Sequence, residues 1–358
     1  MVDRDFWGGR SVFLTGHTGF KGGWLATWLL DMGARVAGYA LTPDTEPSYF
    51  ARCGLGERMT SCIGDVRREH DLRAALAAHA PEVVFHLAAR SLVRPSYRLP
   101  VETFAVNVLG TAHLLEAARH TPSVRAVVVV TSDKCYLNQE RERGYHEAEP
   151  LGGHDPYSAS KAAAELVTAA YRQSFFDAGD AAGLATARAG NVIGGGDWAA
   201  DRLVPDAVRA LERGEPVVVR NPDAVRPWQH ALEPLAGYLM LAQGLHADAR
   251  RYAGAWNFGP LDADTVSVAT LVDLVIQAHG AGAWRRAPAG AAPHEAGMLR
   301  LDCSKAAAAL RWRPRLTLAE ATRLTVDWYR AAGRPGASMY EMSVEQIRAY
   351  ETRWTPGG

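Results

Sequence analysis

Tyr157 and Lys161 are the residues whose types and spacing point most directly to chemistry. They are four positions apart, so on a helix both side chains lie on the same face, one turn from each other. A tyrosine acts as a base near neutral pH only if its pKa of about 10 falls by roughly three units, or about 4 kcal/mol. A lysine ammonium one turn away, together with a second positive group, can supply much of that shift. The same spacing also occurs on exposed helices by chance, so neighbouring residues must support the interpretation.

A second reactive group, Ser132-Asp133-Lys134, follows directly on the apolar run 124–131 (VRAVVVVT). Continuous apolar runs are typical of strands buried on both faces of a sheet. Parallel α/β sheets bind ligands beyond the carboxyl ends of such strands. We therefore expect Ser132 to lie beside Tyr157 and to hydrogen-bond a substrate hydroxyl that Tyr157 deprotonates.

A glycine-rich turn at 16–22 follows the first apolar run, 11–15 (SVFLT), and opens the apolar segment 24–32. Its glycines suit a tight turn, the close approach of a pyrophosphate and anion binding at a helix N-terminus. Glycines are common where helices begin, so the alternative is a plain strand–helix turn. The position after a first strand favours a dinucleotide site. Its candidate residues are Gly16, His17, Thr18, Gly19, Phe20, Lys21 and Gly22.

The choice between NAD and NADP stays open on the next residues. The end of the second predicted strand, 39–42 (YALT), has neither the acid that binds a ribose hydroxyl nor a base for a 2′-phosphate. Asp44 lies slightly beyond, in a loop. Asp65, with Val66 beside it, is better placed to meet an adenine amino group.

The elements around these residues alternate between strands and helices. Apolar runs predict strands at 11–15, 35–39, 59–64, 81–89 and 124–131, and helical patterns lie at 24–32, 69–79, 101–120 and 156–176. This alternation predicts an α/β protein with a Rossmann-type, doubly wound parallel sheet, which strand 185–193 continues.

The second half of the chain has shorter elements. Proline and glycine interrupt them, and 281–293 has the composition of an exposed loop. We expect a cofactor-binding unit at 1–196 that carries the catalytic residues. Residues 197–358 would form mainly a smaller substrate-binding lobe, with segments that return to the sheet.

The composition excludes some classes of partner. The 358 residues contain 39 Lys+Arg and 39 Asp+Glu, so a bulk electrostatic grip on nucleic acid or on an anionic membrane is not expected. The four cysteines have neither metal-ligand nor disulfide-framework spacing, so we expect no metal and a reducing compartment. The N-terminus lacks the apolar core of a signal peptide and no apolar run is long enough for a membrane span. A cytoplasmic protein is predicted.

In this order along the chain, several motifs resemble those of the extended short-chain dehydrogenase/reductases. They are turn 16–22, His86-Leu87-Ala88-Ala89, Asn107 within a helix, Ser132, the pair Tyr157 and Lys161, and 188–192 (RAGNV). For His86, a satisfied histidine at a strand end is at least as good an interpretation as a direct role. Within the superfamily, the chain most resembles the CDP-glucose 4,6-dehydratases, on 16–22, 131–136 (TSDKCY), 194–198 (GGGDW), 226–230 (RPWQH) and 257–260 (NFGP).

The resemblance implies a bound NAD that is reduced and reoxidised within one turnover. Tyr157, Lys161 and Ser132 would serve oxidation at C4 of the sugar. Loss of water then needs a base at C5 and an acid at O6, for which we predict Lys134 and Asp133. In the related dTDP-glucose dehydratases a glutamate stands in the place of Lys134. The implied NAD-binding residues beyond turn 16–22 are Asp65, Val66, Leu87, Ala88, Ala89, Asn107, Tyr157 and Lys161.

Substrate recognition is predicted around 226–230, where Arg226 suits a diphosphate and Trp228 offers a face for a base or sugar. The alternative is a proline-containing turn with an incidental arginine. Recognition of cytosine rests on the resemblance alone. The candidate substrate-binding residues are Arg94, Ser96, Ser132, Asn191, Arg226, Gln229, His230 and Arg300.

Helices 101–120 and 156–176 carry apolar residues at helical spacing, for example Phe104, Val108, Thr111 and Leu115. Such a stripe normally packs against the sheet. The resemblance implies that these helices pair in a homodimer, or in a dimer of such dimers.

Two other functions stay open: a nucleotide-sugar 4-epimerase, which has no need of Asp133 and Lys134, and a non-catalytic dinucleotide-binding regulator, which usually lacks the Tyr or Lys of the pair.

Overall fold

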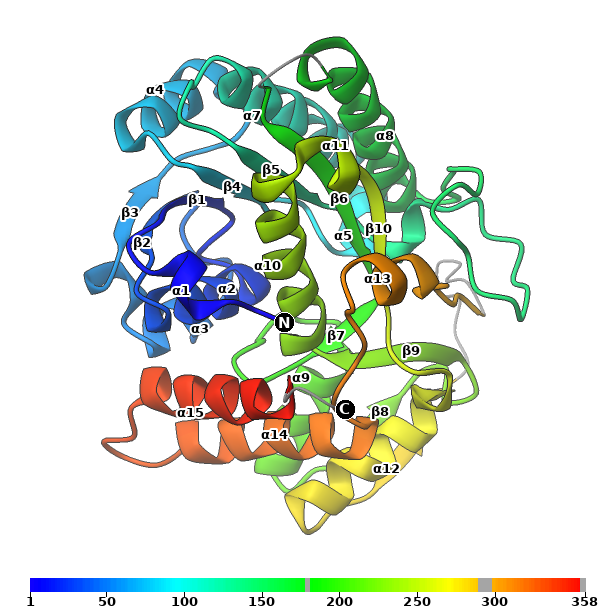
Figure 1. The fold of residues 1–358 in the computed structure, drawn as a ribbon. Helices are drawn as coiled ribbons and strands as arrows, with labels where there is room; N and C mark the ends of the chain where they lie inside the picture. The colour runs from blue at the N-terminus through cyan, green and yellow to red at the C-terminus, as the bar shows by residue number, and fades with distance from the viewer. Residues whose placement is uncertain (178–180, 289–297, 355–358) are drawn as a thin grey trace.

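The computed structural model describes residues 1–177, 181–288 and 298–354. Its centre is a seven-stranded sheet in the order β10-β6-β5-β4-β1-β2-β3 (Figure 1). All neighbouring strands in it are parallel. The strands are β1 (Ser11–Thr15), β2 (Arg35–Ala40), β3 (Thr60–Ile63), β4 (Val83–His86), β5 (Ala126–Val130), β6 (Gly183–Ala189) and β10 (Gly254–Phe258). The predicted doubly wound parallel sheet is confirmed.

Helices cover both faces of this sheet, because its central strands are apolar on both sides (Figure 1). One face packs against α4 (Glu69–His79), α7 (Gly110–Arg119) and α8 (Pro156–Tyr171). The other packs against α2 (Phe20–Asp31) and α10 (Leu232–Ala247). Shorter helices are α1 (Arg4–Trp7), α3 (Tyr49–Arg52), α5 (Val93–Arg98), α6 (Pro100–Phe104) and the 3-10 turns η1 (Leu55–Glu57) and η3 (Asp133–Cys135).

Two predicted helices contain a wider turn. Helix 101–120 is built from α6, the π-helical turn η2 (Ala105–Leu109) and α7, and helix 156–176 is α8 followed by the π-helical turn η4 (Arg172–Phe176). Asn107, a poor helix former, lies within η2. The irregular turn of this helix therefore includes the position of a poor helix former.

The second half forms two small sheets. One has the order β11-β9-β7, from β7 (Asn191–Ile193), β9 (Val225–His230) and β11 (Thr265–Ser267). The other pairs β8 (Val217–Val219) with β12 (Trp284–Arg286). The prediction that 185–193 is one strand of the main sheet is wrong in its second part, because the chain leaves β6 at Gly190 and continues as β7 in the small sheet.

The prediction of an exposed loop at 281–293 is also wrong in part. Residues 284–286 form β12, because β8 offers a parallel partner that is distant in sequence. Positions 289–293 lie outside the described residues. The remaining helices are α9 (Leu203–Glu212), α11 (Ala249–Tyr252), α12 (Val268–His279), α13 (Ser304–Ala309), α14 (Leu318–Ala332), α15 (Met339–Glu351) and the 3-10 turns η5 (Asp262–Asp264) and η6 (Thr352–Trp354).

The C-terminal part of the chain returns to helix α2. Helix α15 packs on α2, where the Trp28 indole donates to Glu351 Oε1 at 2.8 Å. Strand β10 and helix α10 belong to the layers of the main sheet, although they follow residue 197 (Figure 1). The boundary near residue 196 stays a prediction. In the described part of the chain, no helix has the length and apolar character needed to cross a membrane.

Candidate active site

The candidate site lies where β1 and β4 meet at their carboxyl ends. The chain proceeds from β1 through β2 and β3 on one side and returns through β4 to the other, and such a reversal leaves a ligand-binding crevice. The turn after β1 and residues 87–89 after β4 touch there. A Cβ on Gly16 would come within 2.7 Å of the Ala88 backbone nitrogen. Gly16 also has a φ of +78°, which favours glycine.

The N-terminus of α2 has the features of a phosphate site. Gly19 precedes the helix, and no side chain caps its first turn. Gly22 lies so close beneath the turn that a Cβ would be 2.0 Å from the Gly16 carbonyl oxygen. The first backbone N–H groups of a helix lack intrahelical partners and attract anions. The turn therefore fits a dinucleotide pyrophosphate by its backbone.

The side chains of His17 and Thr18 form hydrogen bonds with other residues of the protein. His17 is fully buried against β2 and β3, where its Nε2 shares a hydrogen bond of 2.7 Å with Ser61 Oγ. Burial lowers the pKa of His17 to about 4. Thr18 Oγ1 donates to the carbonyl of Leu41 at 2.8 Å. Any contact of these two residues with a cofactor is thus expected from their backbone.

Lys21 points inward, toward α10. Its Nζ donates to the hydroxyl of Tyr238 at 3.0 Å. Burial lowers the pKa of Lys21 to about 7, and the charges of Lys161 and Arg202 act in the same direction. Lys21 therefore lies in the electrostatic neighbourhood of the reactive residues. Phe20, beside it, packs against Gly194.

Asp65 and Val66 follow β3, as predicted, but both are engaged within the protein. Arg67 donates through Nε to both oxygens of the Asp65 carboxylate, at 3.0 and 2.8 Å. These bonds with Arg67 hold the pKa of Asp65 below its usual range. Val66 is buried, and its carbonyl meets the ring of His113. A contact of Asp65 with adenine stays a prediction.

The end of β4 is anchored to β1. The backbone N–H groups of Leu87 and Ala88 both reach Thr15 Oγ1 at 3.2 Å. His86 is buried between two threonines, with Nδ1 at 2.7 Å from Thr15 Oγ1 and Nε2 at 3.2 Å from Thr111 Oγ1. Burial lowers the pKa of His86 to about 3. The structure thus supports the satisfied-histidine interpretation, and the small residues Ala88 and Ala89 follow it.

Asn107 and Ser96 connect the loop after β4 to α8. Asn107 donates to the carbonyl of Arg90 at 3.0 Å and to Ser160 Oγ at 2.8 Å. Its Oδ1 accepts the backbone N–H of Arg90 at 2.8 Å. Ser96 Oγ accepts the backbone N–H of Tyr157 at 3.2 Å. Both residues hold the start of α8 in place, and their predicted ligand contacts remain predictions.

Tyr157 and Lys161 both lie on α8, as predicted, and both are buried. Burial raises the pKa of Tyr157 to about 12, and a hydrogen bond with Ser132 and the charge of Arg202 oppose that rise. Lys161 Nζ donates to the carbonyl of Val130, at the end of β5, at 3.1 Å. Burial lowers the pKa of Lys161 to about 8. The structure thus brings Ser132, Tyr157 and Lys161 together.

Asp133 is buried beside Ser132, and the Ser132 hydroxyl donates to its Oδ1 at 2.9 Å. Burial raises the pKa of Asp133, and the charges of Lys134 and Arg226 oppose that rise. Lys134 is half-buried at the same turn. A carboxyl that favours its proton can serve as an acid, so the predicted group of catalytic residues is assembled around the end of β5.

Arg202 belongs to this site and was not predicted. It follows β7, donates to Asp197 Oδ2 at 2.7 Å and reaches Ser91 Oγ at 3.2 Å. It therefore bridges the loops that follow β4 and β7. A lone arginine in an irregular segment has no local sequence signal, and its partners are distant in the chain.

Two predicted substrate residues lie at the same edge of the sheet. Arg94 follows β4 and lies 3.7 Å from the carboxylate of Asp201, which also accepts a hydrogen bond from Arg220 at 2.7 Å. Arg226 lies on β9, close enough to Asp133 for its charge to affect the carboxyl. Arginine side chains suit the oxygens of a diphosphate, and for Arg94 and Arg226 that role stays a prediction.

Asn191, Gln229 and His230 lie on the small sheet. Asn191 is half-buried at the start of β7 and pairs in register with Trp228. Gln229 donates to the carbonyl of Phe258 at 2.9 Å. His230 is fully buried with its ring edge against Trp24, and burial lowers its pKa to about 3. A direct substrate contact of His230 would require a ligand to reach the core.

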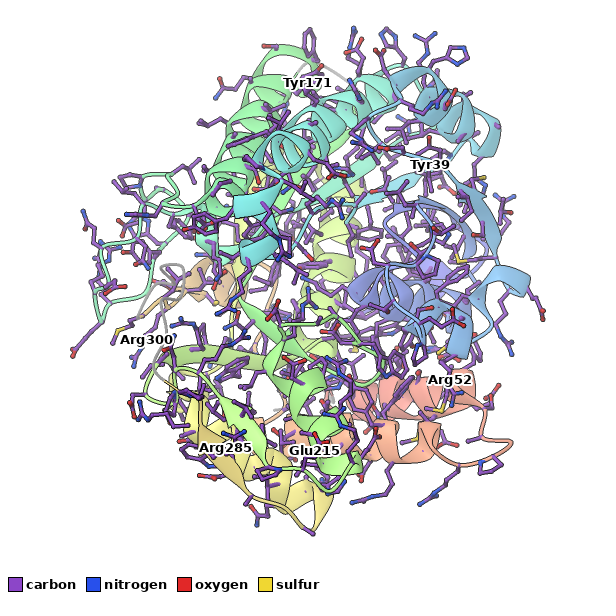
Figure 2. The ribbon with its side chains drawn as sticks, turned by 180° about the vertical axis from the view of Figure 1, so that it is seen from behind. Tyr39, Arg52, Tyr171, Glu215, Arg285 and Arg300 are labelled. Atoms are coloured by element: carbon purple, nitrogen blue, oxygen red, sulfur yellow. The ribbon has the colours of Figure 1, made fainter. Side chains whose placement is uncertain are left out.

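Arg300 lies apart from the turn after β1. Its carbonyl accepts the backbone N–H of Tyr145 at 2.9 Å. Figure 2 shows Arg300 and Tyr39, which lies in β2, on opposite flanks of the molecule. Arg300 is therefore remote from the predicted adenine end of the cofactor site, and its substrate contact stays a prediction.

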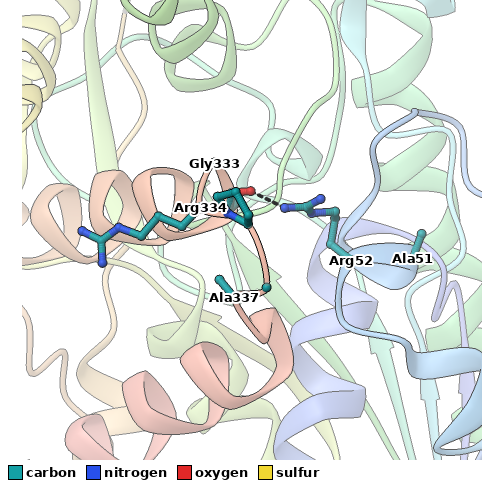
Figure 3. A pocket seen from close by; sticks show the side chains of 8 residues that line it. Ala51, Arg52, Gly333, Arg334 and Ala337 are labelled. Atoms are coloured by element: carbon teal, nitrogen blue, oxygen red, sulfur yellow. Dashed lines mark hydrogen bonds between the residues drawn. The ribbon is translucent and has the colours of Figure 1, made fainter.

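A hollow elsewhere on the surface contains none of the predicted site residues. It has a volume of about 420 Å³ and is formed by α3 and the connection between α14 and α15. Figure 3 shows that the Arg52 guanidinium donates to the Ala332 carbonyl at its rim. Ser132, Tyr157 and Lys161 lie instead near the carboxyl ends of the central strands of the main sheet.

The parallel sheet, the glycine turn and the group of Ser132, Tyr157 and Lys161 make this chain an extended short-chain dehydrogenase/reductase. Within that class it belongs to the family described as GDP-mannose 4,6 dehydratase, which its residues 13–325 match.

Several known proteins are similar to the chain. A CDP-glucose 4,6-dehydratase of Salmonella typhimurium is 49% identical over 99% of this chain and 100% of its own length. A dTDP-glucose 4,6-dehydratase of Actinoplanes sp. is 27% identical over 89% of this chain and 98% of its own. The crystal structure of DesIV, a dTDP-glucose 4,6-dehydratase of Streptomyces venezuelae with NAD and TYD bound, covers 89% of this chain and 96% of its own, with 25% identity and a TM-score of 0.75.

Proposed function

We propose that this protein is an NAD-dependent lyase that converts CDP-glucose to CDP-4-keto-6-deoxyglucose. The observation that carries the proposal is the buried Asp133, which lies beside Ser132 at the end of β5 and whose pKa is raised by burial. Oxidation at C4 alone does not need this acid. The 49% identity to a CDP-glucose 4,6-dehydratase over 99% of the chain supports the same reaction and the same nucleotide.

In the first step, Tyr157 takes the proton of the sugar 4-hydroxyl while the hydrogen on C4 leaves as hydride. Ser132 donates a hydrogen bond to the reacting oxygen, and the positive charge of Lys161 favours ionised Tyr157. NAD, when bound, supplies the acceptor for this hydride and later the donor that returns it to C6. The backbone of turn 16–22 would hold its pyrophosphate.

In the second step, the new ketone at C4 acidifies the proton on C5. Lys134, in its neutral form, removes that proton, and Asp133 protonates the 6-hydroxyl, which leaves as water. The double bond between C5 and C6 then receives the hydride at C6, and protonated Lys134 returns its proton to C5. The oxidation and the reduction cancel, so no external oxidant is consumed.

The 4-epimerase stays the main alternative, and it would use the same Tyr157, Lys161 and Ser132. The epimerase reaction does not require Asp133 or Lys134. A non-catalytic regulator is disfavoured because the tyrosine and lysine are both buried on α8 beside Ser132.

A homodimer is part of the proposal. Val101, Leu109 and Leu166 on α6, η2 and α8 are 81%, 55% and 61% exposed, and a second subunit that packs on these helices would cover them. Phe104 is also exposed, whereas Thr111 and Leu115 of the same predicted stripe are in the core. Sedimentation at micromolar concentration is expected to show a dimer. The balanced charge supports an enzyme without nucleic-acid or membrane partners, and the spacing of the four cysteines supports a reducing, cytoplasmic compartment.

Incubation with CDP-glucose and NAD tests the proposal. Mass analysis is expected to show loss of one water molecule from the sugar nucleotide, and the product to absorb strongly in alkali. An unchanged mass with inversion at C4 would identify the epimerase instead.

A further inference from the structure

An ion pair lies beneath the proposed active site with both partners buried. Arg188 on β6 donates to the Glu165 carboxylate on α8 through Nε at 2.9 Å and Nη2 at 2.7 Å, and both side chains are 3% exposed. Desolvation offsets much of the attraction in such pairs, so a gain in stability does not explain why this pair is buried here. The further hydrogen bonds of Glu165 and Arg188 do explain it.

Glu165 continues the spacing of Tyr157 and Lys161 by one more helical turn. Its Oε1 accepts the hydroxyl of Thr131 at 2.5 Å. Thr131 directly precedes Ser132. Because Lys161 also donates to the carbonyl of Val130, α8 is joined to the chain at the two residues before the catalytic turn 132–135.

Arg188 holds the other end of the same turn. Its Nη1 donates to the hydroxyl of Tyr136 at 2.8 Å, and its guanidinium lies over the Tyr136 ring at 4.8 Å. Tyr136 directly follows the turn and donates to Asn257 Oδ1 on β10 at 2.7 Å. One ion pair therefore contacts both residues that flank turn 132–135.

We propose that Glu165 and Arg188 are positioning residues, which fix Ser132, Asp133 and Lys134 relative to Tyr157 and Lys161. This inference rests on the proposed function and deepens it. Neither residue touches the substrate. Fixing the turn from both ends matters because the reaction needs an acid, a base and Tyr157 on one sugar, and small displacements of reacting groups cost large factors in rate.

The pair also sets the charge around Lys161. Glu165 on α8 and Cys135 in the turn favour its protonated form, whereas burial disfavours it. The charge of Lys161 in turn lowers the pKa of Lys21 on α2 and of His86 on β4. Arg172 in η4 also lies within the field of Glu165. Glu165 thus helps to keep Lys161 charged where Tyr157 must ionise.

Two threonines provide a matched test. Thr131 and Thr186 are both buried, and each donates one hydroxyl to Glu165, but Thr186 lies within β6 at 2.8 Å and is not attached to the turn. Thr131→Val is expected to lower kcat for CDP-glucose dehydration at least about tenfold. Thr186→Val should stay within about twofold of the wild type, with a similar loss of thermal stability. Thr131→Ser, which keeps the hydroxyl, should restore activity.

Two further readouts complete the test. Hydrogen exchange in the peptide spanning 131–136 should increase in Thr131→Val only, a measurement that does not depend on the substrate. In Glu165→Gln, the alkaline limb of the kcat profile should move to lower pH, because loss of the carboxylate charge lowers the pKa of Lys161; a merely structural role would not move it.

Equal activity and exchange in the two valine variants would overturn the inference. A wild-type protein without activity on CDP-glucose would instead reject the proposed function.

Discussion

The carboxylate of Asp133 lies directly against Gly190. A Cβ at position 190 would come within 2.9 Å of Asp133 Oδ2, and Gly190 marks the point where the chain passes from β6 to β7. The glycine therefore leaves room for the proposed acid at the junction of the main and small sheets.

Gly190→Ala is expected to displace the Asp133 carboxyl and to lower the rate of dehydration by about 10- to 100-fold. The φ of Gly190 lies outside the left-handed range, so the effect should arise from contact with Asp133, and to a smaller degree with Pro227 Cγ at 3.3 Å, and not from backbone strain. Gly56→Ala, whose new Cβ would meet only Phe50 at ordinary distance, is the matched control for activity and thermal unfolding. Full dehydratase turnover in Gly190→Ala would contradict the placement of the acid.

Lys134→Met should separate the two halves of the reaction. Tyr157, Lys161 and Ser132 stay intact, so hydride should still leave C4 and the near-ultraviolet absorbance of reduced nicotinamide should appear. Loss of water should fall by at least about 100-fold, because the proposed base at C5 is gone. A variant with full turnover would show that Lys134 is not the base.

Arg202→Met should change the pH dependence of oxidation at C4. Arg202 opposes the rise in the pKa of Tyr157 that burial causes, so its loss should raise that pKa. The acidic limb of the kcat/KM profile is therefore expected to move to higher pH. Arg213→Met removes an arginine whose ion pair with Glu215 lies at the surface, and it should leave the profile in place.

The environment of Glu233 predicts that the free energy of unfolding depends on pH. Its Oε2 accepts the Tyr350 hydroxyl at 2.6 Å, and its Oε1 accepts the backbone N–H groups of Arg315 and Leu316 at 2.8 and 2.7 Å. Burial raises the pKa of Glu233 from 4.5 to about 7. The folded protein thus holds this proton more tightly than the unfolded chain, and the contribution to stability is lost as the pH rises between these values.

Urea unfolding at several pH values measures this effect. The free energy of unfolding attributable to Glu233 should fall by about 3 kcal/mol from acidic to neutral pH. Glu233→Gln should lack that component. The same slope in the variant and in the wild type would assign the pH dependence to other groups.

The sequence predicted the elements whose signals are local. The predicted strand 11–15 and helix 69–79 coincide with β1 and α4, because the first is an uninterrupted apolar run and the second an uninterrupted helical pattern. The glycines of turn 16–22 are an equally local signal. The break at Gly190 was missed because apolar residues continue on both sides of it, and β12 was missed because it depends on a partner, β8, that is distant in sequence.

The site was predicted less completely than the fold. Tyr157, Lys161, Ser132 and Asp133 carry recognisable spacing or strand-end positions, and the structure brings them together. Arg202 gave no signal, since its partners come from separate loops. Glu165 did give one, because it repeats the four-residue spacing after Lys161, but only the fold reveals Arg188 and Thr131 as its partners.

CDP-glucose labelled with deuterium at C4 offers the most direct measurement of the proposed chemistry. The wild-type protein should release a product that has lost one water molecule and carries the deuterium at C6, since the hydride taken from C4 returns there within the same turnover. A product of unchanged mass, or a dehydrated product without deuterium at C6, would contradict the proposed reaction.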